Sequence, residues 1–295
     1  MLVCAPPAFS KANAWKEAGL KGEVQFLKQF KKTAVLLGDT STSIREVETV
    51  RVFGDRGHWL GDQNFREDRS TYYGLHPRYN QQGKILQKNQ YNPKGTIDFQ
   101  TLYTYDKNGK LEETQLYNGD KILEQRTRYQ YNKTGTRIAS YIYGSNDSLL
   151  EKHTYKYNAN GKQVEWNVHN AEGILDPQTI YRYNEENQMI ESASYNYAGI
   201  LYFKTVYTYN KKGAIVSSHS YSLDGTLHSQ AAFVYDTSGH MIAETFEEKG
   251  RKTKNTYSYE EEGNWIKKME YENGVPRFIL ERDLSYHQPY YMHSH

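Results

Sequence analysis

The stretch Ile97–Tyr117, IDFQTLYTYDKNGKLEETQLY, decides the fold of this chain. From Phe99 to Tyr105, aromatic residues and threonine occupy every second position, which is the period of a β-strand. The segment Asp106–Gly109 then matches a type I turn closed by a left-handed glycine, because an Asx residue precedes the glycine by three positions. A second strand, Leu111–Tyr117, follows. The stretch therefore predicts an antiparallel hairpin with a G1 bulge.

This hairpin recurs at a step of 26 residues. Its markers are the aromatic pairs Tyr103/Tyr105, Tyr129/Tyr131, Tyr155/Tyr157, Tyr181/Tyr183, Tyr207/Tyr209 and Phe233/Tyr235, followed after 24 residues by Tyr257/Tyr259. A glycine usually stands four residues after the second aromatic, and Asn187 replaces it once. Asn takes the left-handed conformation at the next lowest cost after Gly. A fixed period of this length predicts a repeat architecture.

Short connections between successive strands require antiparallel neighbours, so the hairpins are expected to join into one long meander. The turn geometry predicts that Tyr105 lies opposite Leu111, and that Tyr209 lies opposite Ile215. A ladder of aliphatic residues on the other face needs cover: Ile138, Val164, Ile190, Val216, Ile242 and Ile266. Long flat sheets are uncommon. We therefore expect an all-β fold consisting of a single elongated antiparallel β-meander, curled or twisted.

The array is expected to cover residues 77–286. Residues 15–76 hold looser alternating stretches and are interpreted as a divergent β N-terminal cap, because terminal repeats are atypical. Residues 1–14 are interpreted as a possible signal-peptide remnant, because an apolar run precedes the small residues Ala12-Asn13-Ala14. This reading favours export to the periplasm, cell surface or medium, with lipidation of Cys4 and a cytoplasmic location as alternatives. Residues 287–295 form a C-terminal tail.

Composition excludes several classes of protein. The 37 basic and 35 acidic residues are well mixed and give a net charge of +2, so there is no electrostatic footprint for nucleic acid. No apolar run approaches the ~20 residues of a membrane span. A single cysteine, Cys4, excludes an internal disulfide. Tyr outnumbers Phe by 28 to 10, which suits a thin structure, because Tyr buries a ring and keeps a hydroxyl at the water.

The pattern Tyr-x-Tyr-[Asp/Asn]-x-x-Gly resembles the YD repeat of Rhs-type bacterial proteins. It occurs at Tyr103–Gly109, Tyr129–Gly135, Tyr155–Gly161 and Tyr207–Gly213. The closing segment, Tyr257–Lys268 followed by Tyr271–Gly274, is similar to short exported YD-like proteins of unknown function that are common in Bacteroidetes. In the large Rhs relatives, such repeats form a spiral β-shell around a toxin. The resemblance implies a curled β-meander and an envelope or surface location.

No reactive cluster stands out, so we expect a non-catalytic protein without cofactor or metal. Paired carboxylates such as Glu112/Glu113 lie at turns or point to opposite faces, which does not suit a glycosidase. An aromatic face with a polar rim suits a protein or glycan partner. The candidate binding residues are Tyr103, Tyr105, Tyr129, Tyr131, Tyr155, Tyr157, Trp166, Tyr181, Tyr183, Tyr207 and Tyr209.

Other interpretations remain open at this point. The tyrosine rings could instead form the core of the sheet. The chain could be a structural or accessory subunit of a cell-envelope assembly, bound by strand addition at the sheet edges. A toxin-associated shell fragment and a glycan-active enzyme are the remaining alternatives.

Overall fold

The computed structural model describes residues 14–33, 46–54, 58–65 and 71–287. Within these residues the chain forms one short helix, α1 (Ala14–Glu17), and a single sheet of 20 strands. The first ten strands are β1 (Val24–Thr33), β2 (Glu46–Phe53), β3 (Trp59–Phe65), β4 (Thr71–Tyr79), β5 (Ile85–Tyr91), β6 (Ile97–Tyr105), β7 (Leu111–Asn118), β8 (Leu123–Tyr131), β9 (Arg137–Gly144) and β10 (Leu149–Tyr157). The others are β11 (Gln163–Asn170), β12 (Leu175–Tyr183), β13 (Met189–Tyr195), β14 (Leu201–Tyr209), β15 (Ile215–Ser222), β16 (Leu227–Tyr235), β17 (Met241–Glu248), β18 (Arg251–Tyr259), β19 (Trp265–Glu272) and β20 (Val275–Tyr286).

The predicted meander is confirmed. Every strand pairs antiparallel with its neighbours in sequence, and the register is the predicted one: Tyr105 lies opposite Leu111, and Tyr209 lies opposite Ile215. The turn chemistry is confirmed as well. The Asp106 carbonyl accepts the Gly109 N–H at 2.8 Å, while the Asp106 carboxylate accepts the Lys110 N–H at 2.7 Å. These bonds close each tight turn locally, which is why the sequence pattern sufficed to place it.

The left-handed positions follow the same local logic. Gly109 has φ 78°, and Asn187 has φ 60° at the position where other units carry glycine. At the opposite end of the hairpins, the turn after β7 contains Gly119, and its left-handed residue is Lys121 (φ 62°). The reason is that this turn is closed from Asn118, whose carbonyl accepts the Lys121 N–H at 3.0 Å.

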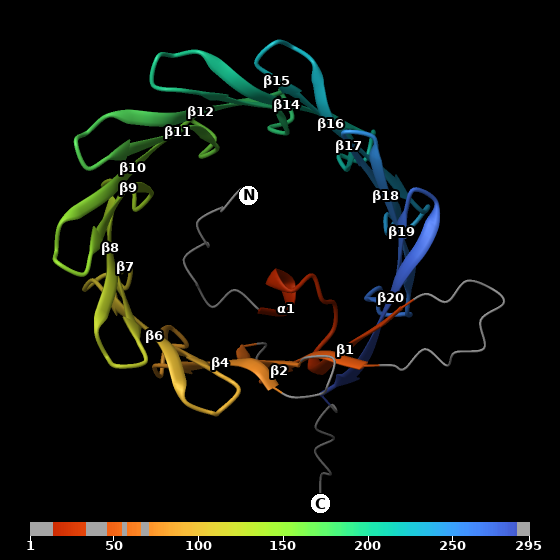
Figure 1. The fold of residues 1–295 in the computed structure, drawn as a ribbon, viewed down its shortest axis with the longest axis horizontal. Coiled ribbons are helices and arrows are strands. Elements are labelled where there is room, and N and C mark those ends of the chain that lie inside the picture. Colours follow the sequence, from red (N-terminus) through yellow and green to blue (C-terminus); the bar gives the residue numbers. More distant parts are fainter. Residues whose placement is uncertain (1–13, 34–45, 55–57, 66–70, 288–295) are drawn as a thin grey trace, which may run out of the picture.

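The meander is curled, as expected, but it is not an elongated ribbon, because the sheet closes into a barrel (Figure 1). Strand β1 pairs with both β2 and β20, and the β1–β20 ladder runs from Val24 opposite Tyr286 to Thr33 opposite Phe278. A bulge or register shift interrupts nearly every ladder, for example between Thr104 and Tyr105. Bulges increase the local twist and bend a sheet. Repeated in each hairpin, they curl the ribbon until its first and last strands meet.

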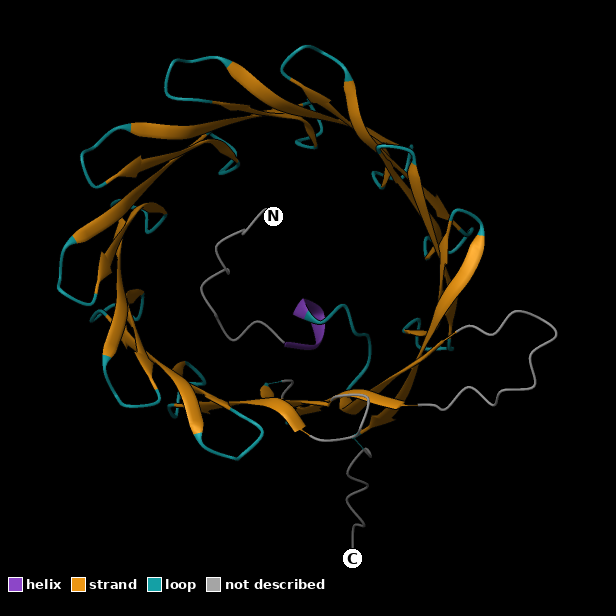
Figure 2. Ribbon diagram, in the orientation of Figure 1, coloured by secondary structure: helices purple, strands orange, loops and turns teal. Residues whose placement is uncertain are grey.

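The segment before β1, residues 14–23, lies inside the ring and will be called the connector (Figures 1 and 2). Its Leu20 packs in a buried cluster with Val24, Leu27 and Phe53. Because the connector is inside, the wall residues that touch it define the inner face. Phe53 stands 26 residues before Tyr79, so the tyrosines of the repeat share this inner face.

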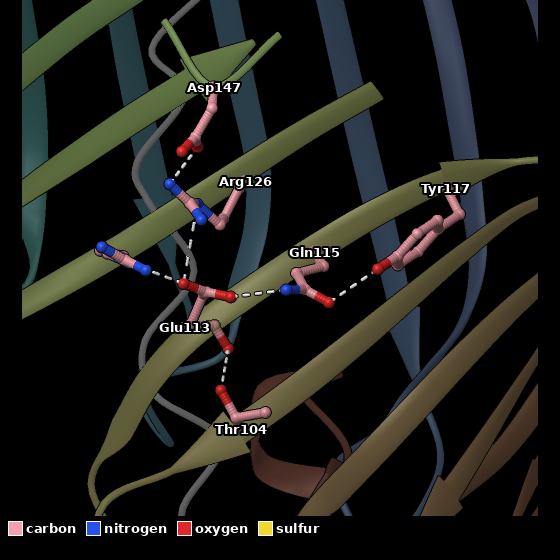
Figure 3. Close-up of polar contacts among 7 residues, drawn as sticks. Thr104, Glu113, Gln115, Tyr117, Arg126 and Asp147 are labelled. Atoms are coloured by element: carbon pink, nitrogen blue, oxygen red, sulfur yellow. Dashed lines mark hydrogen bonds and ion pairs between the residues drawn. The ribbon is translucent and has the colours of Figure 1, made fainter. Parts of the chain in front are cut away.

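The alternate residues form the outer face, which carries charged networks. Glu113 accepts hydrogen bonds from Arg128 Nε at 2.8 Å and Gln115 Nε2 at 2.7 Å (Figure 3). Arg126 lies 3.7 Å from Glu113 and forms an ion pair with Asp147 in the turn after β9. The contacts tie three successive strands together. Two members of the aliphatic ladder, Ile190 and Ile242, are exposed.

Part of the N-terminal region, for which a cap and a signal-peptide remnant were predicted, falls on described residues. Residues 15–76, expected as a divergent β cap, contain the strands β1 and β2, which belong to the same sheet as the repeats. Cys4 and the signal-peptide pattern lie outside the described residues, apart from Ala14, as does the tail beyond His287. The division at residues 76 and 77 stays a prediction.

Candidate functional site

In six of the seven aromatic pairs, the second tyrosine connects one hairpin to the preceding one. Tyr105 donates its hydroxyl hydrogen bond to the Ile85 carbonyl at 2.8 Å, and Tyr209 donates to the Met189 carbonyl at 2.6 Å. The same bond is made by Tyr79, Tyr131, Tyr183, Tyr235 and Tyr259. Burial, the largest cause, raises the pKa of Tyr105 and Tyr209 above that of a free phenol. These hydroxyl groups therefore form hydrogen bonds within the sheet.

The first tyrosines point in the same direction and are packed between strands. The Tyr155 ring is 8% exposed, and its hydroxyl lies 3.2 Å from Ser140 Oγ. Tyr129 makes the equivalent contact with Thr114 at 3.3 Å. Burial, followed by neighbouring tyrosines, raises the pKa of Tyr103 to about 12. All the sequence-predicted site residues thus lie on the inner face as one ladder, and their role in binding stays a prediction.

Trp166 extends this ladder on β11. It lies opposite Tyr155 on one side and Thr179 on the other, and its ring centroid is 5.7 Å from that of His153. The indole Nε1 is buried without a hydrogen-bond partner. A buried donor without a partner is costly. The surface around Trp166 is therefore mainly apolar, and the sheet provides no hydrogen-bond acceptor for the indole N–H.

The connector shows how the inner face holds a main chain. Asn264 Oδ1 accepts the Lys21 N–H at 2.6 Å, and Asn264 Nδ2 donates to the Lys21 carbonyl at 2.9 Å. Asn264 is 1% exposed and also donates to Tyr286 Oη at 3.0 Å. The Lys21 ammonium donates to His240 Nε2 at 3.0 Å, and the His240 ring stacks on Tyr259 at 4.7 Å. One side-chain amide thus satisfies both main-chain groups of a residue inside the ring.

Sequence reasoning missed this contact. Asn264 occupies the position after the turn glycine that is lysine in Lys84, Lys110 and Lys162. This departure from the repeat could have marked Asn264 as a special position. The contact itself could not be predicted, because the partner Lys21 is 243 residues away and lies outside the repeats.

The inner face also carries charge near the β1–β20 seam. Arg282 lies with its guanidinium 3.5 Å from the centroid of the Trp265 ring, and its Nε donates to Gln29 Oε1 at 3.2 Å. Burial, followed by the nearby cation Arg51, lowers the pKa of Arg282 to about 10. Arg51 itself is neutralised by a bidentate pair with Asp62, with both N–O distances at 2.7 Å. Arg282 was also missed, because the last strand has no tyrosine pair to mark it.

Two absences apply to the described part of the chain alone. There, no three His, Cys, Asp or Glu side chains are grouped as the ligands of a metal ion would be. No helix in the same residues has the length and apolar character needed to cross a membrane. The expectation that the protein uses no metal or cofactor, and is not an enzyme, stays a prediction.

Residues 202–288 match a family model described as "Uncharacterised protein". No curated protein matches the chain. Among solved structures, the chain is similar to the TcdB2–TccC3 complex, with 13% identity, a TM-score of 0.43 and coverage of 85% of this chain and 15% of that chain. The Tc holotoxin pore of Photorhabdus luminescens gives 13% identity, a TM-score of 0.43 and coverage of 88% and 15%. This chain therefore spans only a small part of the length of these relatives.

A porin-like protein from Bacteroides uniformis gives 10% identity and a TM-score of 0.38, covering 90% of this chain and 98% of that chain. TM-scores this low carry no argument, so the relation to YD-repeat proteins stays a prediction.

Proposed function

We propose that this chain is a non-catalytic, exported β-repeat ring whose inner face binds an extended polypeptide segment. The single observation that carries the proposal is the contact of Asn264 with the N–H and carbonyl of Lys21. A side-chain amide that satisfies both main-chain groups recognises a polypeptide independently of its side chains. The surrounding tyrosine ladder offers ring surface for the side chains of such a segment.

The alternative partner from sequence, a glycan, has less support. Glycan binding by aromatic residues uses open ring faces and free polar groups around them. Here the second hydroxyl in six of the seven aromatic pairs is bonded to a main-chain carbonyl, as in Tyr209 to Met189. Ring faces are also covered by cations, since Arg137 lies over both Tyr129 and Tyr155, at 5.6 and 5.1 Å.

Closure also bears on the accessory-subunit alternative. Strand addition needs an edge strand with unpaired main-chain groups. Within the described residues, β1 pairs on both sides and β20 pairs with β1 and β19. The proposal therefore places the contact with a partner on the inner face. Export remains part of the proposal through the N-terminal pattern and the YD-repeat resemblance.

The test uses two adjacent alanines of β16 as a matched pair. Ala231 faces inward, because it pairs with Ser218, which itself lies opposite Tyr207. Ala232 faces outward and is exposed. In a full-length Cys4→Ser background, Ala231→Cys and Ala232→Cys would each carry a benzophenone photo-crosslinker. The probe is an unfolded, labelled model polypeptide.

We expect crosslinks from position 231 and few from position 232. Equal yields from both positions would contradict binding on the inner face. A glycan panel run in parallel decides between the partners, since glycan binding without polypeptide crosslinks would overturn the proposal.

A further inference from the structure

Arg282 lacks the acidic partner that a partly buried guanidinium normally has. Its Nε contacts Gln29 and its plane lies over Trp265, and no carboxylate in the described residues lies within ion-pair distance of it. Burial of a charge costs free energy unless the charge is paired. The nearby Arg51 adds to this cost, in keeping with the lowered pKa of Arg282.

The acidic groups on neighbouring strands of the inner face are already occupied. Asp62 is held by Arg51 and by the Trp59 indole N–H at 2.6 Å. Glu244 accepts the Tyr257 hydroxyl at 2.6 Å. Lys268 lies 2.8 Å from the carboxylate of Glu270. None of these carboxylates is left to neutralise Arg282, so its two terminal nitrogens remain available to a ligand.

Arg137 repeats this arrangement on the opposite part of the ring. Its guanidinium lies 5.6 Å from the Tyr129 ring and 5.1 Å from the Tyr155 ring, and it has no ion-pair partner in the described part of the chain. Lys31 likewise lies 4.1 Å over the Phe278 ring. Within the described residues, Asp62, Glu244 and Glu270 are thus bonded inside the wall, whereas the cations Arg282, Arg137 and Lys31 lie over aromatic rings.

We infer that the inner face selects an acidic polypeptide segment, whose carboxylates form charge-assisted hydrogen bonds with Arg282 and Arg137. This inference rests on the proposed function and adds the chemistry of the partner. Arg is suited to the role, because its fork matches a carboxylate with two parallel hydrogen bonds. The aromatic ring beneath each guanidinium fixes its plane before the ligand arrives, which lowers the entropic cost of binding.

The test measures binding by the full-length protein with two labelled peptides, one of alternating Glu and Ala and its twin of alternating Gln and Ala. We expect fluorescence anisotropy to show binding of the Glu peptide that weakens with added salt. Arg282→Gln and Arg137→Gln should each weaken it by about tenfold or more, the loss of a charge-assisted hydrogen bond. Arg182→Gln is the matched control, because Arg182 is exposed on the outer face and pairs with Glu191 at 3.2 Å.

A stability measurement separates binding from a purely structural role. If Arg282 serves a ligand, Arg282→Met should leave the melting temperature of the free protein unchanged or raise it, since an unpaired charge is removed. A marked fall in melting temperature together with unchanged peptide affinity would overturn the inference.

The peptide outcomes are distinguishable. Equal binding of the Glu and Gln peptides would leave the proposed function standing and overturn the preference for acidic segments. Binding of neither peptide would overturn both. Binding of a sulfated polysaccharide in place of the Glu peptide would also overturn the inference, because the partner would then be a polyanion of another class.

Discussion

At the scale of the residue, the prevalence of tyrosine has a physical cause. The wall is a single sheet with water on both faces, so an inward ring must pack against its neighbours and still satisfy main-chain carbonyls. Tyr209 does both, since its ring lies on the inner face and its hydroxyl reaches Met189. Where the connector covers the equivalent position, the residue is Phe53, which is 2% exposed. A ring that is fully buried has no contact with water and needs no hydroxyl group, which explains why Phe replaces Tyr at this position.

This account predicts that Tyr209→Phe destabilises the fold although it removes a single oxygen atom. The Met189 carbonyl would lose its partner from the next hairpin, at a cost of about 0.5–1.5 kcal/mol in the free energy of unfolding. Chemical denaturation followed by circular dichroism would measure the change.

The control is Tyr221→Phe on the outer face, whose ring contacts Lys204 at 5.8 Å and whose hydroxyl has no hydrogen-bond partner in the described residues. It should change stability little. Equal effects of the two substitutions would show that the hydroxyl ladder contributes nothing particular.

At the scale of the element, the hairpin is the part of the fold that sequence predicts well. The strand period, the Asx residue and the glycine act within a few residues of each other, so Tyr105 opposite Leu111 follows from local chemistry. The looser turns also form locally: after β7 the Asn118 carbonyl accepts the Lys121 N–H, so Lys121 takes the left-handed conformation although Gly119 stands in the same turn. Local signals therefore fix strands and register.

The turn glycine provides the element-scale prediction. Gly161 has φ 72°, and a Cβ added there meets nothing within 4 Å, so substitution isolates the backbone effect. Gly161→Ala should destabilise by about 1 kcal/mol, because the left-handed conformation costs an L-residue roughly 1–2 kcal/mol and a stiffer unfolded chain returns part of it.

Gly161→Asn should cost less than Gly161→Ala, since Asn187 already adopts φ 60° at the equivalent position. Thermal or chemical unfolding of the two variants would give the order. An alanine variant as stable as the asparagine variant would contradict a left-handed requirement at this turn.

At the scale of the whole molecule, sequence reasoning reached its limit. The 26-residue period is the same for an open ribbon and a closed ring, because closure depends on how bulges add their twist over 20 strands. The period also leaves open which face is inside. That is decided by the connector, through contacts such as Leu20 with Phe53. For the same reason the tyrosine ladder could be predicted, whereas Asn264 and Arg282 could not.

Closure itself can be tested with a disulfide across the seam. Lys28 and Asp283 are register partners in the β1–β20 ladder. Register partners in antiparallel strands have Cα atoms about 4.5–5.5 Å apart, within the range of about 4.4–6.8 Å that a disulfide spans. In a Cys4→Ser background, Lys28→Cys with Asp283→Cys should therefore oxidise to a disulfide within one chain, which mass spectrometry and non-reducing electrophoresis would detect.

The matched control pairs Lys28→Cys with Glu281→Cys. Glu281 lies opposite Phe30, so this pair is displaced by two residues along the ladder, a separation of roughly 7–8 Å. It should oxidise much less readily. An open ribbon would leave residues 28 and 283 at opposite ends of the sheet, and neither pair would close within a chain. Covalent dimers from the first pair would mean that β1 of one chain pairs with β20 of another, which would replace the ring by an exchanged assembly and remove the enclosed inner face on which the proposed binding depends.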